Sequence, residues 1–147
     1  MVGYWEQPEA TADALADEWF HTGDGGVLDD EGYLTIVDRK KDVIISGGEN
    51  VSSIEVEDVL HGHPAVAEVA VIGVPDERWG ETVMALVVPA ADQAEVTAQE
   101  LIAYSRERLA HFKCPTSIEL RESLTRTATG KLQKSRLREP YWEGHDR

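Results

Sequence analysis

The chain has 147 residues, of which 41% are hydrophobic, and a formal net charge of −14 at pH 7. This length can bury one ordinary core with a short appendage, which excludes a two-domain enzyme. The negative charge argues against nucleic acid as a partner, because proteins neutralise its phosphates with Lys and Arg. The longest uncharged stretch is too short for a membrane span, and the single Cys114 cannot form an internal disulfide. We therefore expect a cytoplasmic protein.

The charge is unevenly distributed along the chain. Residues 1–100 carry 22 acidic side chains against 4 Lys and Arg, whereas residues 101–147 carry 6 against 10. Any site for an anion is therefore expected late in the chain.

The N-terminal third predicts a helix, a hairpin and a polar boundary. Residues 7–19 are acidic and rich in alanine, and we expect an exposed helix with Thr11 as its cap. Two β-favouring runs, residues 27–28 and 33–37, flank an Asp-rich segment that ends in glycine, which indicates a hairpin. The polar cluster at residues 38–42 interrupts this β pattern before it resumes at 43–45, so it is a candidate boundary or hinge.

The remaining two thirds alternate between strands and capped helices. Ser52 and Glu55, and later Thr97 and Glu100, have the spacing of capping boxes. The predicted elements are a loop at 47–48, helices at 52–60 and 97–109, strands at 66–72, 82–88 and 117–120, a flexible loop at 127–130, and a basic helix at 131–139 stopped by Pro140. This pattern predicts an α+β fold, a small mixed β-sheet flanked by helices and preceded by a β-hairpin and hinge segment.

Several motifs occur in an order that is typical of one enzyme family. They are Gly3-Tyr4-Trp5 with Pro8-Glu9-Ala10-Thr11, Trp19-Phe20-His21-Thr22-Gly23-Asp24, Asp38-Arg39-Lys40-Lys41-Asp42, Ile45-Ser46-Gly47-Gly48-Glu49-Asn50-Val51, and Thr129-Gly130-Lys131. Together they resemble the acyl-CoA synthetase branch of the adenylate-forming (AMP-binding) superfamily. The resemblance spans almost the whole chain. The chain has nothing that matches the family's phosphate loop or acyl pocket, so we expect no catalysis by the chain alone.

The resemblance implies a division of the chain. Residues 1–38 would be the tail of a large N-terminal AMP-binding domain, residues 39–42 the hinge, and residues 43–147 the mobile C-terminal lid domain. The partner would be the chain's own large domain, and the substrate a small carboxylic acid that the sequence does not identify. The implied reaction converts acid, ATP and CoA into acyl-CoA, AMP and pyrophosphate.

The resemblance also assigns residues to the adenylation step. Lys131 corresponds to the catalytic lysine, with a solvated surface lysine as the alternative. Asp24 corresponds to the aspartate that accepts the ribose hydroxyls of ATP or AMP, with a turn-forming Asp as the alternative. Arg39 corresponds to an arginine near the same ribose and phosphates, with an ion pair to Asp38 or Asp42 as the alternative. Mg²⁺ would travel with ATP, held mainly by the large domain, and the His and Cys spacing predicts no metal site in this chain.

A second set of residues is implied for thioester formation. Lys41 occupies the hinge position, with a solvated charge in a turn as the alternative. The glycine-rich loop would line the passage for the pantetheine arm of CoA, with a plain loop as the alternative; its residues are Ser46, Gly47, Gly48 and Glu49. Trp79 and Phe112 would stack on the CoA adenine or pack at the rim of the core. The basic residues that would meet the CoA phosphates are Arg106, Arg108, Lys113 and Arg126.

Two other functions remain open from the sequence. The chain can belong to a ligase that forms an acyl-adenylate and passes the acyl group to a carrier protein. It can also be a freestanding module that binds a nucleotide or a partner without chemistry.

Overall fold

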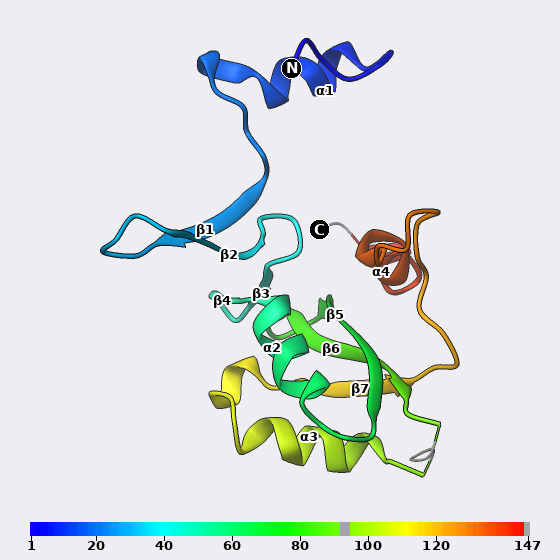
Figure 1. The fold of residues 1–147 in the computed structure, drawn as a ribbon. Helices are drawn as coiled ribbons and strands as arrows, with labels where there is room; N and C mark the ends of the chain where they lie inside the picture. The colour runs from blue at the N-terminus through cyan, green and yellow to red at the C-terminus, as the bar shows by residue number, and fades with distance from the viewer. Residues whose placement is uncertain (92–94, 146–147) are drawn as a thin grey trace. The chain divides into compact units, whose positions relative to one another are not determined.

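The computed structural model describes residues 1–91 and 95–145 (Figure 1). The chain forms two compact units, Met1–Lys41 and Asp42–Arg147. Each unit has its own secondary structure and is described by itself.

The first unit begins with two short helical segments. Helix α1 spans Pro8–Ala14, with Pro8 at the start, where its missing N–H costs nothing, and a 3-10 turn, η1, spans Ala16–Glu18. The prediction that Thr11 caps this helix is wrong. Thr11 lies inside α1, where its hydroxyl donates to the carbonyl of Gln7 at 2.7 Å and accepts the N–H of Tyr4 at 2.9 Å.

The hairpin of the first unit is longer than the sequence pattern predicted. Strands β1, Asp24–Leu28, and β2, Leu34–Arg39, pair antiparallel, with a register shift between Gly25 and Gly26. Part of the polar cluster therefore lies within β2 and does not interrupt it. Of residues 1–41, all of which are described, only Asp38 is buried, so this unit has no apolar core of its own.

The second unit is built on a mixed five-stranded sheet. Its strands are β3 (Ile44–Ser46), β4 (Glu49–Val51), β5 (Val66–Asp76), β6 (Gly80–Pro89) and β7 (Ser117–Leu120). The order is β4-β3-β6-β5, and β7 pairs parallel to β6. Strand β7 has the predicted bounds, and β5 and β6 extend beyond theirs. Strand β4 was not predicted, because three residues before a helix give no visible alternation.

The helices of this unit are α2 (Ser53–His61), α3 (Ala98–Arg106), the 3-10 turn η2 (His111–Lys113) and α4 (Lys134–Trp142). The capping box of α3 is confirmed: the hydroxyl of Thr97 accepts the N–H of Glu100, whose carboxylate accepts the N–H of Thr97. Helix α2 has half of such a box. The Ser52 side chain accepts the N–H of Glu55 at 3.3 Å, whereas the Glu55 carboxylate pairs with Lys113 at 2.7 Å.

Helices cover both faces of the sheet (Figure 1). On one face, alternate residues of β5 and β6, among them Val71 and Ala85, pack with buried residues of α2 and α3. On the other face, the intervening residues, among them Ile72 and Leu86, pack with Leu137 of α4. Burial on both faces explains why these strands read as unbroken apolar runs.

The predicted end of the last helix is wrong. Pro140 does not stop α4, which runs on through Tyr141 and Trp142. Proline removes one helical hydrogen bond, but bonds outside the helix hold the residues that follow it. Tyr141 donates to Glu119, and the indole N–H of Trp142 donates to the carbonyl of Gly73 at 2.9 Å. These contacts offset the loss.

Candidate functional site

Lys131 lies exposed at the end of a small loop closed by hydrogen bonds. The N–H of Thr127 donates to the carbonyl of Lys131 at 2.8 Å, and the N–H of Lys131 donates to the hydroxyl of Thr127 at 3.1 Å. Gly130 has a φ of +85°, which favours glycine at this turn. Among the described residues, Lys131 has no carboxylate partner. Its ammonium is therefore available to a ligand.

The guanidinium of Arg126 links this loop to strand β5 by hydrogen bonds. One nitrogen, Nη1, donates to the carbonyl of Gly130 at 2.7 Å, and the other, Nη2, donates to the carboxylate of Glu68 at 2.7 Å. Two other basic residues expected near CoA phosphates also have carboxylate partners: Lys113 pairs with Glu55 at 2.7 Å and Arg108 with Glu107 at 2.9 Å.

The structure brings the two predicted nucleotide residues together. Asp24 and Arg39 are register partners across the β1–β2 hairpin, and Arg39 Nε lies 3.2 Å from Asp24 Oδ1. Asp24 begins a strand and does not form a turn. The side chain of Asp38 instead accepts the backbone N–H of Arg39 at 2.7 Å. A pocket of about 580 Å³ within this unit is lined by Asp24 together with His21, Thr22 and Lys40.

The glycine pair forms a two-residue turn joining β3 to β4. Gly47 and Gly48 have φ values of +60° and +87°, and two positive values are characteristic of type I′ hairpin turns. Ser46 pairs with Glu49 across the turn and with Gly80 of β6. The backbone of the turn is exposed at both glycines.

Trp79 covers one of these glycines. The N–H of Gly47 donates to the carbonyl of Trp79 at 2.9 Å, and the indole lies against Gly47. Trp79 remains 47% exposed, with the guanidinium of Arg78 4.5 Å from its ring centroid. Phe112 is 46% exposed, with the ammonium nitrogen of Lys113 5.8 Å from its ring centroid. Each aromatic side chain is thus a partly open surface beside a cation.

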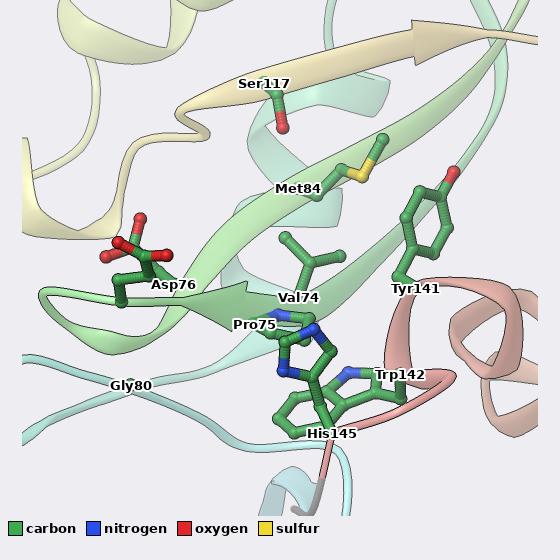
Figure 2. A pocket seen from close by; sticks show the side chains of 10 residues that line it. Val74, Pro75, Asp76, Gly80, Met84, Ser117, Tyr141, Trp142 and His145 are labelled. Atoms are coloured by element: carbon green, nitrogen blue, oxygen red, sulfur yellow. The ribbon is translucent and has the colours of Figure 1, made fainter.

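A pocket of about 500 Å³ at the end of α4 was not foreseen from the sequence. Figure 2 shows Tyr141, Trp142 and His145 beside the strand residues Val74 and Met84. Its residues are separated by about half of the chain, and no local motif links them. None of the predicted site residues lines it.

Tyr141 of this pocket forms a polar cluster with Glu119 and Arg121, and the pKa values of Glu119 and Tyr141 are shifted. The hydrogen bond from Tyr141, followed by that from Arg121, lowers the pKa of Glu119 below its usual value. Burial raises the pKa of Tyr141, and its hydrogen bond to Glu119 raises it further. The phenol therefore stays protonated, and the carboxylate ionised, across the neutral range.

Two mostly buried ion pairs attach α4 to the rest of the second unit. Lys134 lies 2.7 Å from Glu57 of α2 and also donates to the hydroxyl of Ser53 at 2.7 Å. Arg138 lies 3.6 Å from Asp42, the residue that follows the predicted hinge residue Lys41. Lys41 is exposed and ends the first unit.

Within the described ranges, no group of three His, Cys, Asp or Glu side chains is arranged to hold a metal ion. No helix in the same ranges is long and apolar enough to cross a membrane.

The mixed sheet between helical layers matches solved adenylate-forming enzymes, among them the o-succinylbenzoate–CoA synthetase of Bacillus subtilis, with a TM-score of 0.83 and 42% identity, over 92% of this chain and 27% of that one. The family described as "AMP-binding enzyme C-terminal domain" matches residues 55–131, more than half of the chain, and the chain belongs to this family.

The relatives include ligases with different acids and acceptors in their names. Identity is 55% to the long-chain-fatty-acid–CoA ligase FadD13 of Mycobacterium tuberculosis, over 94% of this chain and 27% of that protein. Identity is 51% to a feruloyl-CoA synthase of Amycolatopsis, over 96% of this chain and 28% of that protein. Identity is 47% to the fatty acid–[acyl-carrier-protein] ligase ScoC of Streptomyces coeruleorubidus, over 97% of this chain and 27% of that protein.

Solved structures agree with the fold. The ATP-bound MatB of Rhodopseudomonas palustris matches with a TM-score of 0.86 and 39% identity, over 98% of this chain and 29% of that one. The chain thus spans little more than a quarter of the length of the proteins it matches.

Proposed function

We propose that the chain contains the hinge and lid domain of an ATP-dependent acyl-CoA synthetase, which joins a carboxylic acid to CoA with release of AMP and pyrophosphate. Residues 39–42 form the hinge, residues 1–38 end the large N-terminal domain, and residues 43–147 form the lid. The division into compact units between Lys41 and Asp42 supports this arrangement. The observation that carries the proposal is an exposed Lys131 without a carboxylate partner among the described residues, in a chain of this family.

The first unit supports the presence of a large domain. It exposes bulky apolar side chains, among them Trp5 at 87%, Trp19 at 75% and Leu28 at 67%. A two-stranded hairpin is at best marginally stable alone, and this many large exposed apolar side chains in one small unit favour contact with another protein surface. The remainder of the large domain is the partner that we propose for this surface.

Adenylation is the first step. A carboxylate oxygen of the acid bonds to the α-phosphorus of ATP, and the bond to the leaving pyrophosphate breaks. Negative charge accumulates on the phosphoryl oxygens, and a preorganised ammonium stabilises it most when water is excluded. Lys131 supplies this charge, and Asp24 accepts hydrogen bonds from the ribose hydroxyls beside Arg39. ATP brings Mg²⁺, whose ligands we assign mainly to the large domain.

Thioester formation is the second step and uses another surface of the lid. After rotation at Lys41, the thiol of CoA attacks the acyl carbonyl, AMP leaves, and the thiol proton is released. The exposed backbone of Gly47 and Gly48, between Ser46 and Glu49, allows close approach of the pantetheine arm, with the Trp79 indole beside Gly47. Trp79 and Phe112 provide half-exposed rings for the CoA adenine, each beside a cation.

A carrier protein is the second candidate acceptor, because the relative ScoC is named for one. The two acceptors differ in size and chemistry. Incubation of the full-length ligase with acid, ATP and either CoA or an acyl carrier protein that has a free phosphopantetheine thiol distinguishes them by the thioester that forms.

The test of the proposed function compares the full-length ligase with residues 1–147 alone. The full-length ligase is expected to form AMP, pyrophosphate and acyl-CoA in equal amounts, and the chain alone none of them. Turnover by the chain alone would overturn the proposal. So would micromolar CoA binding by the chain alone, measured by calorimetry, with no turnover by the full-length protein; a binding module without chemistry predicts that result.

A further inference from the structure

We propose that Arg126 is a positioning residue, which fixes the direction of the Lys131 side chain by tying its loop to strand β5 through Glu68. The inference rests on the proposed function, because it concerns the placement of the adenylation lysine. It assigns to Arg126 a role in adenylation, where the sequence had suggested CoA phosphates.

The geometry of the Arg126 guanidinium carries the argument. Its two terminal nitrogens have different partners, the Gly130 carbonyl and the Glu68 carboxylate, each at 2.7 Å. Glu68 belongs to β5, whose following residues Val69 and Ala70 are buried in the core. The planar, rigid guanidinium suits such a bridge better than a flexible ammonium does. It therefore ties the loop to a strand of the domain core.

The bond to Gly130 acts directly on Lys131. The carbonyl of Gly130 and the N–H of Lys131 belong to one planar peptide unit. Arg126 holds the carbonyl end of this unit, and the hydroxyl of Thr127 holds the N–H end at 3.1 Å. With both ends held, rotation of this peptide plane is restrained. The bond from the N–H of Thr127 to the carbonyl of Lys131 restrains the following peptide, so the Cα–Cβ direction of Lys131 is restrained from both sides. Gly130 has no Cβ, and a Cβ there would meet nothing within 4 Å, so side-chain packing does not supply this restraint.

The downstream side of the loop is already anchored by Lys134, through Glu57 and Ser53. Arg126 supplies the corresponding restraint upstream. Its own pair with Glu68 is open to solvent, with side chains 41% and 40% exposed, and such surface pairs contribute little to stability. A role in placing Lys131 and a role in folding therefore predict different results.

The experiment uses the full-length ligase with Arg126→Met. Acyl-adenylate formation is expected to slow roughly 10- to 100-fold, the range for a misplacement of about 1 Å, with little change in the KM for ATP. Thioester formation from preformed acyl-adenylate is expected to change by less than about twofold, because it does not use Lys131. Glu68→Gln is expected to cause a smaller loss of the same kind.

The matched control is Arg121→Met, which also removes an arginine that pairs with a glutamate, at 2.8 Å, and whose other side-chain bond is to Tyr141. Its adenylation rate is expected to equal that of the wild type. In a Lys131→Ala background, Arg126→Met is expected to have no further effect, because it acts through the side chain already removed. A thermal melt of each variant shows that the fold persists.

The outcomes separate this inference from the proposed function. A normal adenylation rate in Arg126→Met beside a slow one in Lys131→Ala overturns the inference alone. An undiminished effect of Arg126→Met in the Lys131→Ala background also overturns it. A normal rate in Lys131→Ala overturns the proposed function, and the inference with it.

Discussion

A Cβ placed on Gly47 would lie 2.7 Å from Cε3 of Trp79, whereas a Cβ placed on Gly48 would meet nothing within 4 Å. Both glycines have positive φ, so backbone strain affects an alanine at either position. Only Gly47 is also restricted by a neighbouring side chain. The glycine pair thus has two causes, turn geometry at both positions and contact with Trp79 at one.

Alanine substitutions in the glycine turn separate these causes. Gly48→Ala is expected to lower the free energy of unfolding by about 1 kcal/mol, the cost of a side chain at positive φ. Gly47→Ala is expected to cost about 1 to 3 kcal/mol more, because of the overlap with the indole. Urea denaturation of the chain measures both. Trp79→Ala added to Gly47→Ala should remove most of the difference, and equal costs in the two single variants would contradict the contact.

The Tyr141–Glu119 hydrogen bond predicts a dependence of stability on pH. The pKa of Glu119 is lowered in the folded state, so its contribution is present above its ordinary value of 4.5 and is lost as the pH falls through the lowered value. The pKa of Tyr141 is raised, so its contribution is present below 10.0 and is lost as the pH rises through the raised value.

Tyr141→Phe is therefore expected to cost about 1 kcal/mol near pH 7, since the carboxylate is partly exposed to solvent. The difference from the wild type should shrink below about pH 4 and above about pH 10, because Glu119 gains a proton at low pH and Tyr141 loses one at high pH. Denaturation at a series of pH values measures it. A cost that stays constant from about pH 3 to 7 would show that Glu119 is not involved.

Removing the cation of the Lys134–Glu57 pair is expected to lower the free energy of unfolding strongly. The two side chains are only 14% and 17% exposed, and Glu57 also accepts the N–H of Val71 at 2.7 Å. Lys134→Met leaves a mostly buried carboxylate without its cation, and we expect a loss of about 3 kcal/mol in the free energy of unfolding. Glu57→Gln in the same chain should restore about half, because the amide oxygen still accepts the Val71 N–H. No recovery in the double variant would exclude the unpaired charge as the cause.

Local sequence signals predicted the elements whose causes are local. Strand β7 has its predicted bounds, and the capping box of α3 closes as its spacing indicated. The prediction failed where distant contacts decide: α4 continues past Pro140 because the residues after it bond to Glu119 and Gly73. The same holds in the site. Arg126 and Glu68 are 58 residues apart, and nothing in either segment indicates that they meet.

For Asp24 and Arg39, the resemblance predicted a shared site, and the structure adds the direct contact between them. Two residues assigned by resemblance to one nucleotide site are register partners in one hairpin. Their roles came from the family, and the hairpin came from the β-favouring runs between them. Their 3.2 Å contact required the register, which the sequence alone did not fix.

We propose that the Lys131 ammonium serves adenylation and not thioester formation. In the full-length ligase, Lys131→Ala is expected to slow acyl-adenylate formation by about 10² to 10³ or more, as loss of one preorganised charge does. Arg136→Ala removes a nearby exposed cation and serves as the control, with no loss expected. The decisive measurement is the rate of each half-reaction in Lys131→Ala: the account predicts a large loss in adenylation and a far smaller one in thioester formation from preformed acyl-adenylate, and equal losses in both would contradict it.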